Sequence, residues 1–190
     1  IETSDGFLKA ATELGAHLEG EVAKMTLGTP VRFNGMFYFR HMQNQSLDTA
    51  RFKTRTAQLR AEILGWMSLA QNTMMIGYDT GHLPLALSHL APEARLTAID
   101  PCRWPLEKDK SPPLRKHYVP AACAYLSASL PQGYRISTGQ IETELPNLQG
   151  EVIDLLVVCD PDHHTLGELM RLWPHLGPDS LILIASERLN

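Results

Sequence analysis

A short glycine-containing segment, Gly77-Tyr78-Asp79-Thr80-Gly81-His82, follows one predicted strand and precedes a predicted helix. Glycines in such a turn let the backbone approach a ligand closely and point amide N–H groups at it. The next predicted strand ends in Asp100, whose carboxylate could accept both hydroxyls of a ribose. The glycine pattern is G-x-x-x-G, however, rather than the G-x-G-x-x-G of the dinucleotide fingerprint. A nucleotide-binding turn and a tight turn without a ligand both fit these residues.

The elements that must position this turn alternate between strand and helix from residue 73 onward. The predicted strands cover residues 73–77, 95–100, 134–138, 152–159 and 180–185. The predicted helices between them cover residues 83–90, 120–130 and 164–176. Strands with almost no polar residue, such as 152–159, are typical of sheets covered on both faces. We therefore expect an α/β fold with a doubly wound, mostly parallel Rossmann-like sheet, helices on both faces and ligands at the carboxyl ends of the strands.

Residues 1–72 differ from this pattern, and we interpret them as an amino-terminal extension ahead of a core at residues 73–190. Apolar residues recur at helical spacing over residues 4–28, and a second helix is predicted over residues 48–71. Between them, Asn34-Gly35 inside the apolar stretch 31–39 predicts a β-hairpin, because both turn positions need a positive φ. We expect this helical and hairpin segment to form a lid or a dimer surface.

The composition narrows the class of protein. The chain has 190 residues, 44% of them hydrophobic and 20% charged, which is enough for one sizeable core. The net charge of −4 and the lack of a Lys/Arg block argue against a general nucleic-acid binder. No apolar run approaches the roughly 20 residues that a membrane span needs. The three cysteines form no C-x-x-C pair, so we expect reduced thiols in a cytoplasmic protein rather than a disulfide framework or a structural zinc site.

Five segments, in the same order along the chain, share motifs with one enzyme family. Residues 77–82 resemble its first motif, "G-Y-N-A-G-H", and residues 95–100 resemble its second strand with the ribose-binding acid. Residues 117–126 resemble the helix before its third strand, and Ser-Thr-Gly-Gln at 137–140 stands where the family has Gly-Asp or Gly-Asn beside the adenine. Residues 154–163 resemble its fourth strand, "D-L-x-x-I-D-G-D-H". The chain thus resembles the class I S-adenosylmethionine-dependent methyltransferases of the bacterial catechol and macrocin O-methyltransferase-like group.

The resemblance implies S-adenosylmethionine as the cofactor and methyl transfer to an oxygen of a small molecule. Methyl transfer to oxygen needs a deprotonated acceptor, which a base or a hard cation such as Mg²⁺ can provide. By the resemblance His163 is the general base and Asp160 lines the cofactor, and Asp160 and Glu187 could bind Mg²⁺. In the alternative interpretation Asp160 and Asp162 only cap the following helix. The implied cofactor-binding residues are Gly77, Tyr78, Gly81, His82, Asp100, Pro101, Gln140, Ile141 and Asp160.

Three features depart from the family pattern. Met75 stands where the family has an acid that contacts the methionine end of the cofactor, and Gln140 replaces the acid of the third motif. The chain also ends at Asn190, soon after the fifth predicted strand, where the family adds two antiparallel strands. A non-Met first residue, Ile1, fits a piece excised from a longer protein.

These departures leave a second interpretation open, in which the chain is a catalytically degenerate module for binding or assembly within a larger protein. A nicotinamide-dependent oxidoreductase fits Asp100 but not the glycine spacing. The expected partners are a small-molecule acceptor and either a second copy of the chain or a larger parent protein. We expect neither nucleic acid nor membrane as a partner.

Overall fold

The computed structural model describes residues 5–25, 50–102, 115–159, 161 and 164–185. The strands in these ranges are β1 (Asn72–Ile76), β2 (Arg95–Asp100), β3 (Tyr134–Thr138), β4 (Ile153–Cys159) and β5 (Leu176–Ala185). The α-helices are α1 (Asp5–Met25), α2 (Ala50–Leu69), α3 (His82–Leu90), α4 (Arg115–Ser129) and α5 (Thr165–Leu172). Three 3-10 helices are η2 (Ile141–Thr143), η3 (Leu145–Leu148) and η4 (Trp173–His175). Within the described ranges, no helix combines the length and the apolar character that crossing a bilayer requires.

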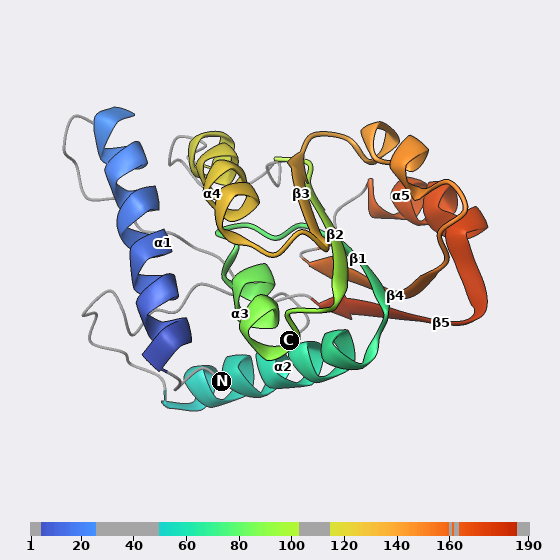
Figure 1. Ribbon diagram of the computed structural model, residues 1–190, viewed down its shortest axis with the longest axis horizontal. Coiled ribbons are helices and arrows are strands. Elements are labelled where there is room, and N and C mark those ends of the chain that lie inside the picture. Colours follow the sequence, from blue (N-terminus) through green and yellow to red (C-terminus); the bar gives the residue numbers. More distant parts are fainter. Residues whose placement is uncertain (1–4, 26–49, 103–114, 160, 162–163, 186–190) are drawn as a thin grey trace.

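The five strands form one sheet in the order β3-β2-β1-β4-β5, and every neighbouring pair is parallel (Figure 1). The chain adds strands outward from β1 in one direction and then crosses back to add β4 and β5 on the other side. This order reverses between β1 and β4, which is the position where ligands bind in open α/β sheets. The doubly wound Rossmann-like sheet predicted from the sequence is confirmed.

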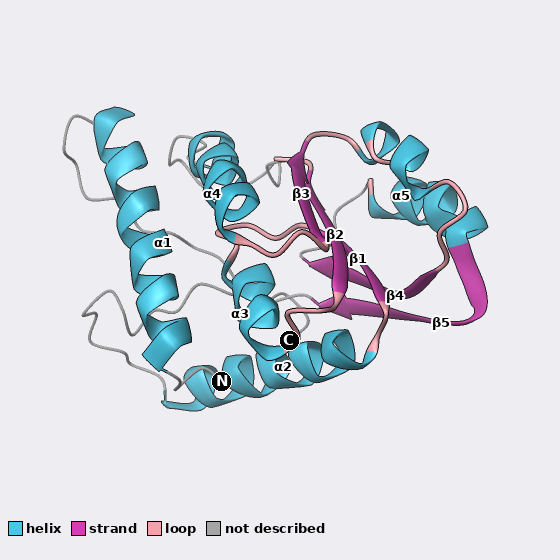
Figure 2. Cartoon of the chain, in the orientation of Figure 1, coloured by secondary structure: helices cyan, strands magenta, loops and turns pink. Residues whose placement is uncertain are grey.

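Helices cover both faces of the sheet, as Figure 2 shows. Alternate side chains of a strand point to opposite faces, and Met74 and Met75 accordingly belong to two separate buried clusters. Met75 packs with side chains of α1, α2, α3 and α4, whereas Met74 packs with side chains of η2, η3 and α5. The absence of polar alternation in the strand sequences follows from this burial on both faces.

The amino-terminal helices share a core with the strands. Five side chains of α1 at helical spacing are at most 1% exposed, namely Phe7, Ala11, Leu14, Leu18 and Val22. They and the buried residues of α2, Ile63, Leu64 and Met67, belong to the same cluster as Met75. The proposed role of this segment as a lid or dimer surface stays a prediction, and the predicted hairpin at 31–39 lies outside the described residues.

Helix α4 and strand β5 begin several residues earlier than the sequence predicts. Helix α4 starts at Arg115 and contains Pro120 as an internal residue, whereas the sequence predicts Pro120 as the first residue of the helix. Buried Tyr118, Val119, Ala122 and Leu126 form a stripe that holds the additional turn on the core, which offsets the amide hydrogen that proline lacks. Strand β5 starts at Leu176, and its first part is irregular, since Leu176 pairs with Ile153 but Leu181 pairs with Leu155.

Candidate functional site

The segment between β1 and α3 is a compact turn built largely on positive φ angles. Gly77, Asp79 and Gly81 have φ values of 79°, 51° and 81°. The Gly77 N–H donates to Ile99 O at 2.8 Å, and the Gly81 N–H donates to Tyr78 O at 2.8 Å. The turn is therefore tied to β2 at its start and closed on itself before α3 begins at His82.

Both glycines have a packing reason to be glycine. A Cβ at Gly77 would lie 2.8 Å from the backbone oxygen of Cys159, at the carboxyl end of β4. A Cβ at Gly81 would lie 2.4 Å from Leu126 Cδ1 of α4. The backbone contact at Gly77 and the positive φ at both positions favour glycine whether or not a ligand binds, so the G-x-x-x-G spacing alone does not distinguish the two interpretations of the turn.

Asp100 links the loops at the carboxyl ends of three strands. Its Oδ2 accepts the Asp79 N–H at 2.9 Å, and its Oδ1 accepts the Cys102 N–H at 2.8 Å. Its backbone oxygen accepts the Gly139 N–H at 3.0 Å, in the loop after β3. The side chain has no exposed surface (0%), although each carboxylate oxygen can accept more than one hydrogen bond. Asp100 thus lies where the resemblance places the ribose acceptor, and main-chain donors already orient it.

Two further turn side chains, Tyr78 and His82, are fully buried. The Tyr78 hydroxyl makes no hydrogen bond of ordinary geometry among the described residues. Burial, with smaller contributions from Cys123 and Asp100, raises the pKa of Tyr78 far above its usual value, so the phenol stays neutral. His82 Nδ1 lies 3.0 Å from the Thr80 hydroxyl. The contact of Tyr78 and His82 with a cofactor stays a prediction.

The structure also places the other residues implied at the nucleotide site. Met75, at the position of the family's acid, is fully buried in the core. Pro101 is half-buried directly after β2, and Gln140 is exposed as the residue before η2. Ile141 is 1% exposed and packs in the cluster under η2 and η3. The loops after β2 and β3 therefore meet beside Asp100, with the Gln140 side chain in solvent.

Asp160, His163 and Glu187 lie outside the described residues. The residues that precede them on β4 and β5, Cys159 and Ala185, are register partners at the carboxyl edge. The described residues hold no group of three or more His, Cys, Asp or Glu side chains suited to a metal ion. The base and the Mg²⁺ ligands consequently remain predictions from the resemblance.

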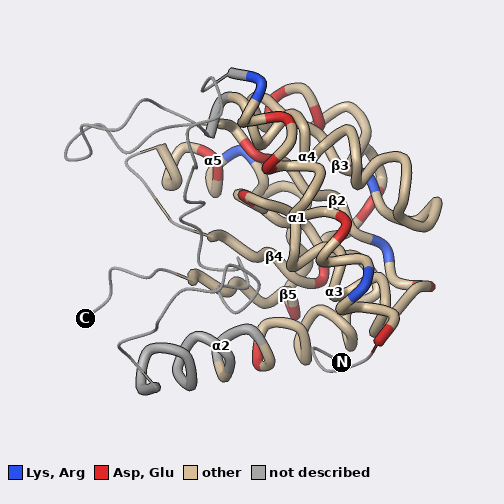
Figure 3. Tube along the Cα trace, turned by 90° about the vertical axis from the view of Figure 1, so that its left-hand side faces the viewer, with Lys and Arg blue, Asp and Glu red and all other residues tan. Residues whose placement is uncertain are grey.

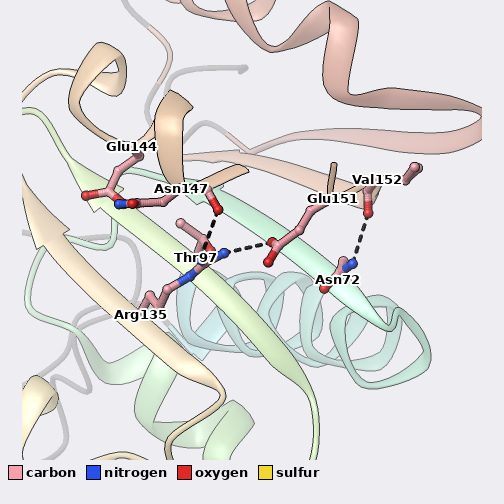
Figure 4. A network of polar contacts seen from close by, with 7 residues as sticks. All are labelled: Asn72, Thr97, Arg135, Glu144, Asn147, Glu151 and Val152. Atoms are coloured by element: carbon pink, nitrogen blue, oxygen red, sulfur yellow. Dashed lines mark hydrogen bonds and ion pairs between the residues drawn. The ribbon is translucent and has the colours of Figure 1, made fainter. Parts of the chain in front are cut away.

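A second polar cluster lies at the opposite, amino end of the sheet (Figure 4). The Arg135 guanidinium donates to Thr97 Oγ1 and Asn147 O, both at 3.1 Å, and to Glu151 Oε2 at 2.8 Å. Arg135, Thr97 and Glu151 border a cavity of about 190 Å³ that also touches Asn72 and Ile153. Because the Arg135 donors are paired with groups of this chain, we interpret the cluster as a link between β3 and the segment before β4.

Sequence reasoning missed a contact beneath the glycine turn. The hydroxyl of Tyr118, on α4, donates a hydrogen bond to Asp79 Oδ1. Tyr118 and Asp79 are 39 residues apart, and neither carries a local pattern that predicts the pair. Only the packing of α4 against α1 and β3 could have revealed it.

No protein-family model matches the chain, and no curated protein matches it either. Among solved structures, cofactor-bound Rv0187 from MTB is similar with a TM-score of 0.53 and 15% identity, over 96% of this chain and 67% of that one. The O-methyltransferase TomG from Streptomyces achromogenes, solved in complex with SAM, is similar with a TM-score of 0.50 and 14% identity, over 97% of this chain and 66% of that one. The chain thus spans about two thirds of the length of each. At such identities the likeness establishes the fold.

Proposed function

We propose that this chain is the cofactor-binding core of an S-adenosylmethionine-dependent methyltransferase that transfers a methyl group to an oxygen of a small molecule. The observation that carries the proposal is the position of Asp100. A carboxylate at the end of β2, oriented by N–H groups of the turn after β1 and of the loop after β2, suits the two hydroxyls of a ribose. The fold shared with TomG and Rv0187 supports the same conclusion.

Within this proposal the cofactor supplies the methyl group, and the chain binds and orients it. Asp100 accepts the ribose hydroxyls, while Gln140 and Ile141 lie beside the adenine. The residues after β4 act on the acceptor, with His163 taking its proton and Asp160 lining the cofactor. If a hard cation assists, Asp160 and Glu187 supply oxygen ligands of the type that Mg²⁺ prefers.

A non-catalytic module for binding or assembly is the second candidate function, and the burial of the site favours it. Asp100 has no exposed surface, and Met75 is fully buried where the family has an acid. Apolar side chains of β5 are also exposed, at 44% for Leu181 and 50% for Ile184. Binding of the cofactor by the purified chain distinguishes the two functions.

The distribution of positively charged side chains among the described residues supports a small-molecule partner. The Lys and Arg residues coloured in Figure 3 lie on several elements. A polyanion would need a cluster of such side chains to neutralise its phosphates.

We further propose a cytoplasmic enzyme that works as a homo-oligomer or within a larger parent protein.

The test is calorimetric titration of the purified chain with S-adenosylmethionine and S-adenosylhomocysteine, with and without Mg²⁺. Micromolar binding of both nucleosides supports the methyltransferase. A folded sample that binds neither contradicts it and favours the module. An affinity or heat that changes with Mg²⁺ supports the cation site, and identical titrations argue against it.

A further inference from the structure

Tyr118 makes a hydrogen bond that reaches into the glycine turn from a different layer of the molecule. Its hydroxyl, on α4, donates to Asp79 Oδ1, and the two residues are 5% and 6% exposed. Asp79 is a non-glycine residue at φ 51°, a left-handed conformation that costs energy for most side chains. A buried carboxylate also needs donors, and Tyr118 supplies one from outside the turn.

The backbone of Asp79 continues this contact to the candidate ribose acceptor. The Asp79 N–H donates to Asp100 Oδ2 at 2.9 Å, while the Cys102 N–H holds Asp100 Oδ1 at 2.8 Å. The direction of the Asp79 N–H depends on the left-handed φ of that residue. Tyr118, Asp79 and Asp100 therefore form one chain of contacts from α4 to the end of β2.

We propose that Tyr118 is a positioning residue for the nucleoside: through Asp79 it sets the orientation of the Asp100 carboxylate toward the ribose hydroxyls. The inference rests on the proposed function, because it assumes a nucleoside at this edge of the sheet. Each carboxylate oxygen can accept more than one hydrogen bond, a capacity that suits a group binding two neighbouring hydroxyls. Since Asp100 has no exposed surface, adjacent groups must move before the ribose reaches it, and the N–H bonds keep the carboxylate oriented meanwhile.

The Tyr118→Phe variant tests this role when two ligands are compared by calorimetry, S-adenosylhomocysteine and its analogue lacking both ribose hydroxyls. We expect the variant to weaken S-adenosylhomocysteine roughly tenfold and the analogue by less than about twofold, because the effect passes through the hydroxyls. A residue that only stabilises the fold would weaken both ligands equally. The matched control is Tyr134→Phe, since Tyr134 is 6% exposed and donates to Ala91 O at 2.7 Å, away from this turn.

A second pair of variants tests the middle of the chain of contacts. Asp79→Asn keeps a side-chain oxygen for the Tyr118 hydroxyl and tolerates the left-handed backbone, so affinity should stay near the wild-type value. Asp79→Ala removes the acceptor, and we expect the same ribose-dependent loss as in Tyr118→Phe. If Tyr118→Phe does not fold, the two Asp79 variants still test whether Tyr118 positions Asp100 through Asp79.

The outcomes separate this role from the proposed function. Unchanged affinity in Tyr118→Phe, or equal losses for the two ligands, overturns the positioning role while wild-type binding still supports the methyltransferase. If the wild-type chain binds no S-adenosylhomocysteine, the proposed function fails and the role of Tyr118 fails with it. Equal affinities of Asp79→Ala and Asp79→Asn also overturn the role.

Discussion

The two ends of the sheet both carry hydrogen-bonded polar groups, but the groups differ in how deeply they are buried. At the carboxyl end, main-chain N–H groups from two loops fix the Asp100 carboxylate, and the side chain has no exposed surface. At the amino end, Arg135 pairs with Glu151, and their side chains are 41% and 32% exposed. Asp154 also accepts two main-chain N–H bonds there, from Gln71 and Asn72.

This difference in burial between the two ends of the sheet bears on which end binds the proposed ligand. Partly exposed ion pairs contribute little to stability, and their partners satisfy one another. A buried carboxylate and a non-glycine residue at positive φ are both costly, and the surrounding structure must hold them in place. Costly arrangements of this kind cluster at functional sites, which favours the carboxyl end as the binding site. Three matched pairs test this comparison, and each pair has one residue near the carboxyl end of the sheet and one near the amino end.

The largest expected effect is on stability, for Gly77→Ala compared with Gly150→Ala. Both glycines have φ 79°, but a Cβ at Gly150 meets nothing within 4 Å, whereas one at Gly77 meets Cys159 O at 2.8 Å. We expect Gly150→Ala to lower the free energy of unfolding by about 1–2 kcal/mol through backbone strain. Gly77→Ala should cost about 1–3 kcal/mol more because the turn must move. Chemical denaturation measures both, and equal losses would show that the turn yields freely to β4.

The next effect concerns affinity, for Asp100→Asn compared with Asp154→Asn. Both substitutions keep an oxygen for a main-chain donor and remove the charge. We expect Asp100→Asn to weaken S-adenosylhomocysteine about tenfold or more, as hydrogen bonds to charged groups are the stronger ones. Asp154→Asn should stay within about twofold of wild type, because it changes only the amino end. Titration calorimetry gives both values, and similar affinities of the two variants would contradict the placement of the site.

The smallest effect concerns two buried tyrosines, Tyr78 in the glycine turn and Tyr134 at the start of β3. Tyr134 donates to Ala91 O at 2.7 Å, so Tyr134→Phe should cost about 1 kcal/mol at neutral pH. The Tyr78 hydroxyl has no such bond among the described residues, so Tyr78→Phe should be neutral or slightly stabilising. Denaturation curves at pH 7 measure the contrast, and a loss in Tyr78→Phe as large as in Tyr134→Phe would refute it.

The same tyrosines predict a loss of stability at high pH. Burial raises the pKa of each above the usual value of about 10. Above that pH the unfolded chain releases its phenolic protons while the folded chain retains them, so the free energy of unfolding falls as pH rises. Below about pH 10 both phenols are protonated in the folded and the unfolded chain, so their contribution to stability is fully present. Tyr78→Phe should flatten this decline, and an unchanged slope would mean that Tyr78 ionises freely in the folded protein.

Local sequence patterns predicted most of the fold because they depend on nearby residues. Strands β2 and β3 occupy the predicted residues, and β1 and β4 begin within one residue of the prediction. The start of α4 was wrong by five residues, because the buried stripe before Pro120 depends on contacts with the core. The glycine turn and Asp100 were identified from spacing, but their main-chain contacts were not.

The sequence by itself determined the elements, their order, and the position of Asp100 at the end of a strand. Apolar runs and turn residues act over a few neighbours, so they can be read without a structure. Only the tertiary structure decided that main-chain N–H groups donate to the buried Asp100 carboxylate. The same holds for the hydrogen bond from Tyr118 to Asp79, which lies 39 residues away in the sequence. Such contacts depend on strand order, register and helix packing, which bring together residues that share no local pattern.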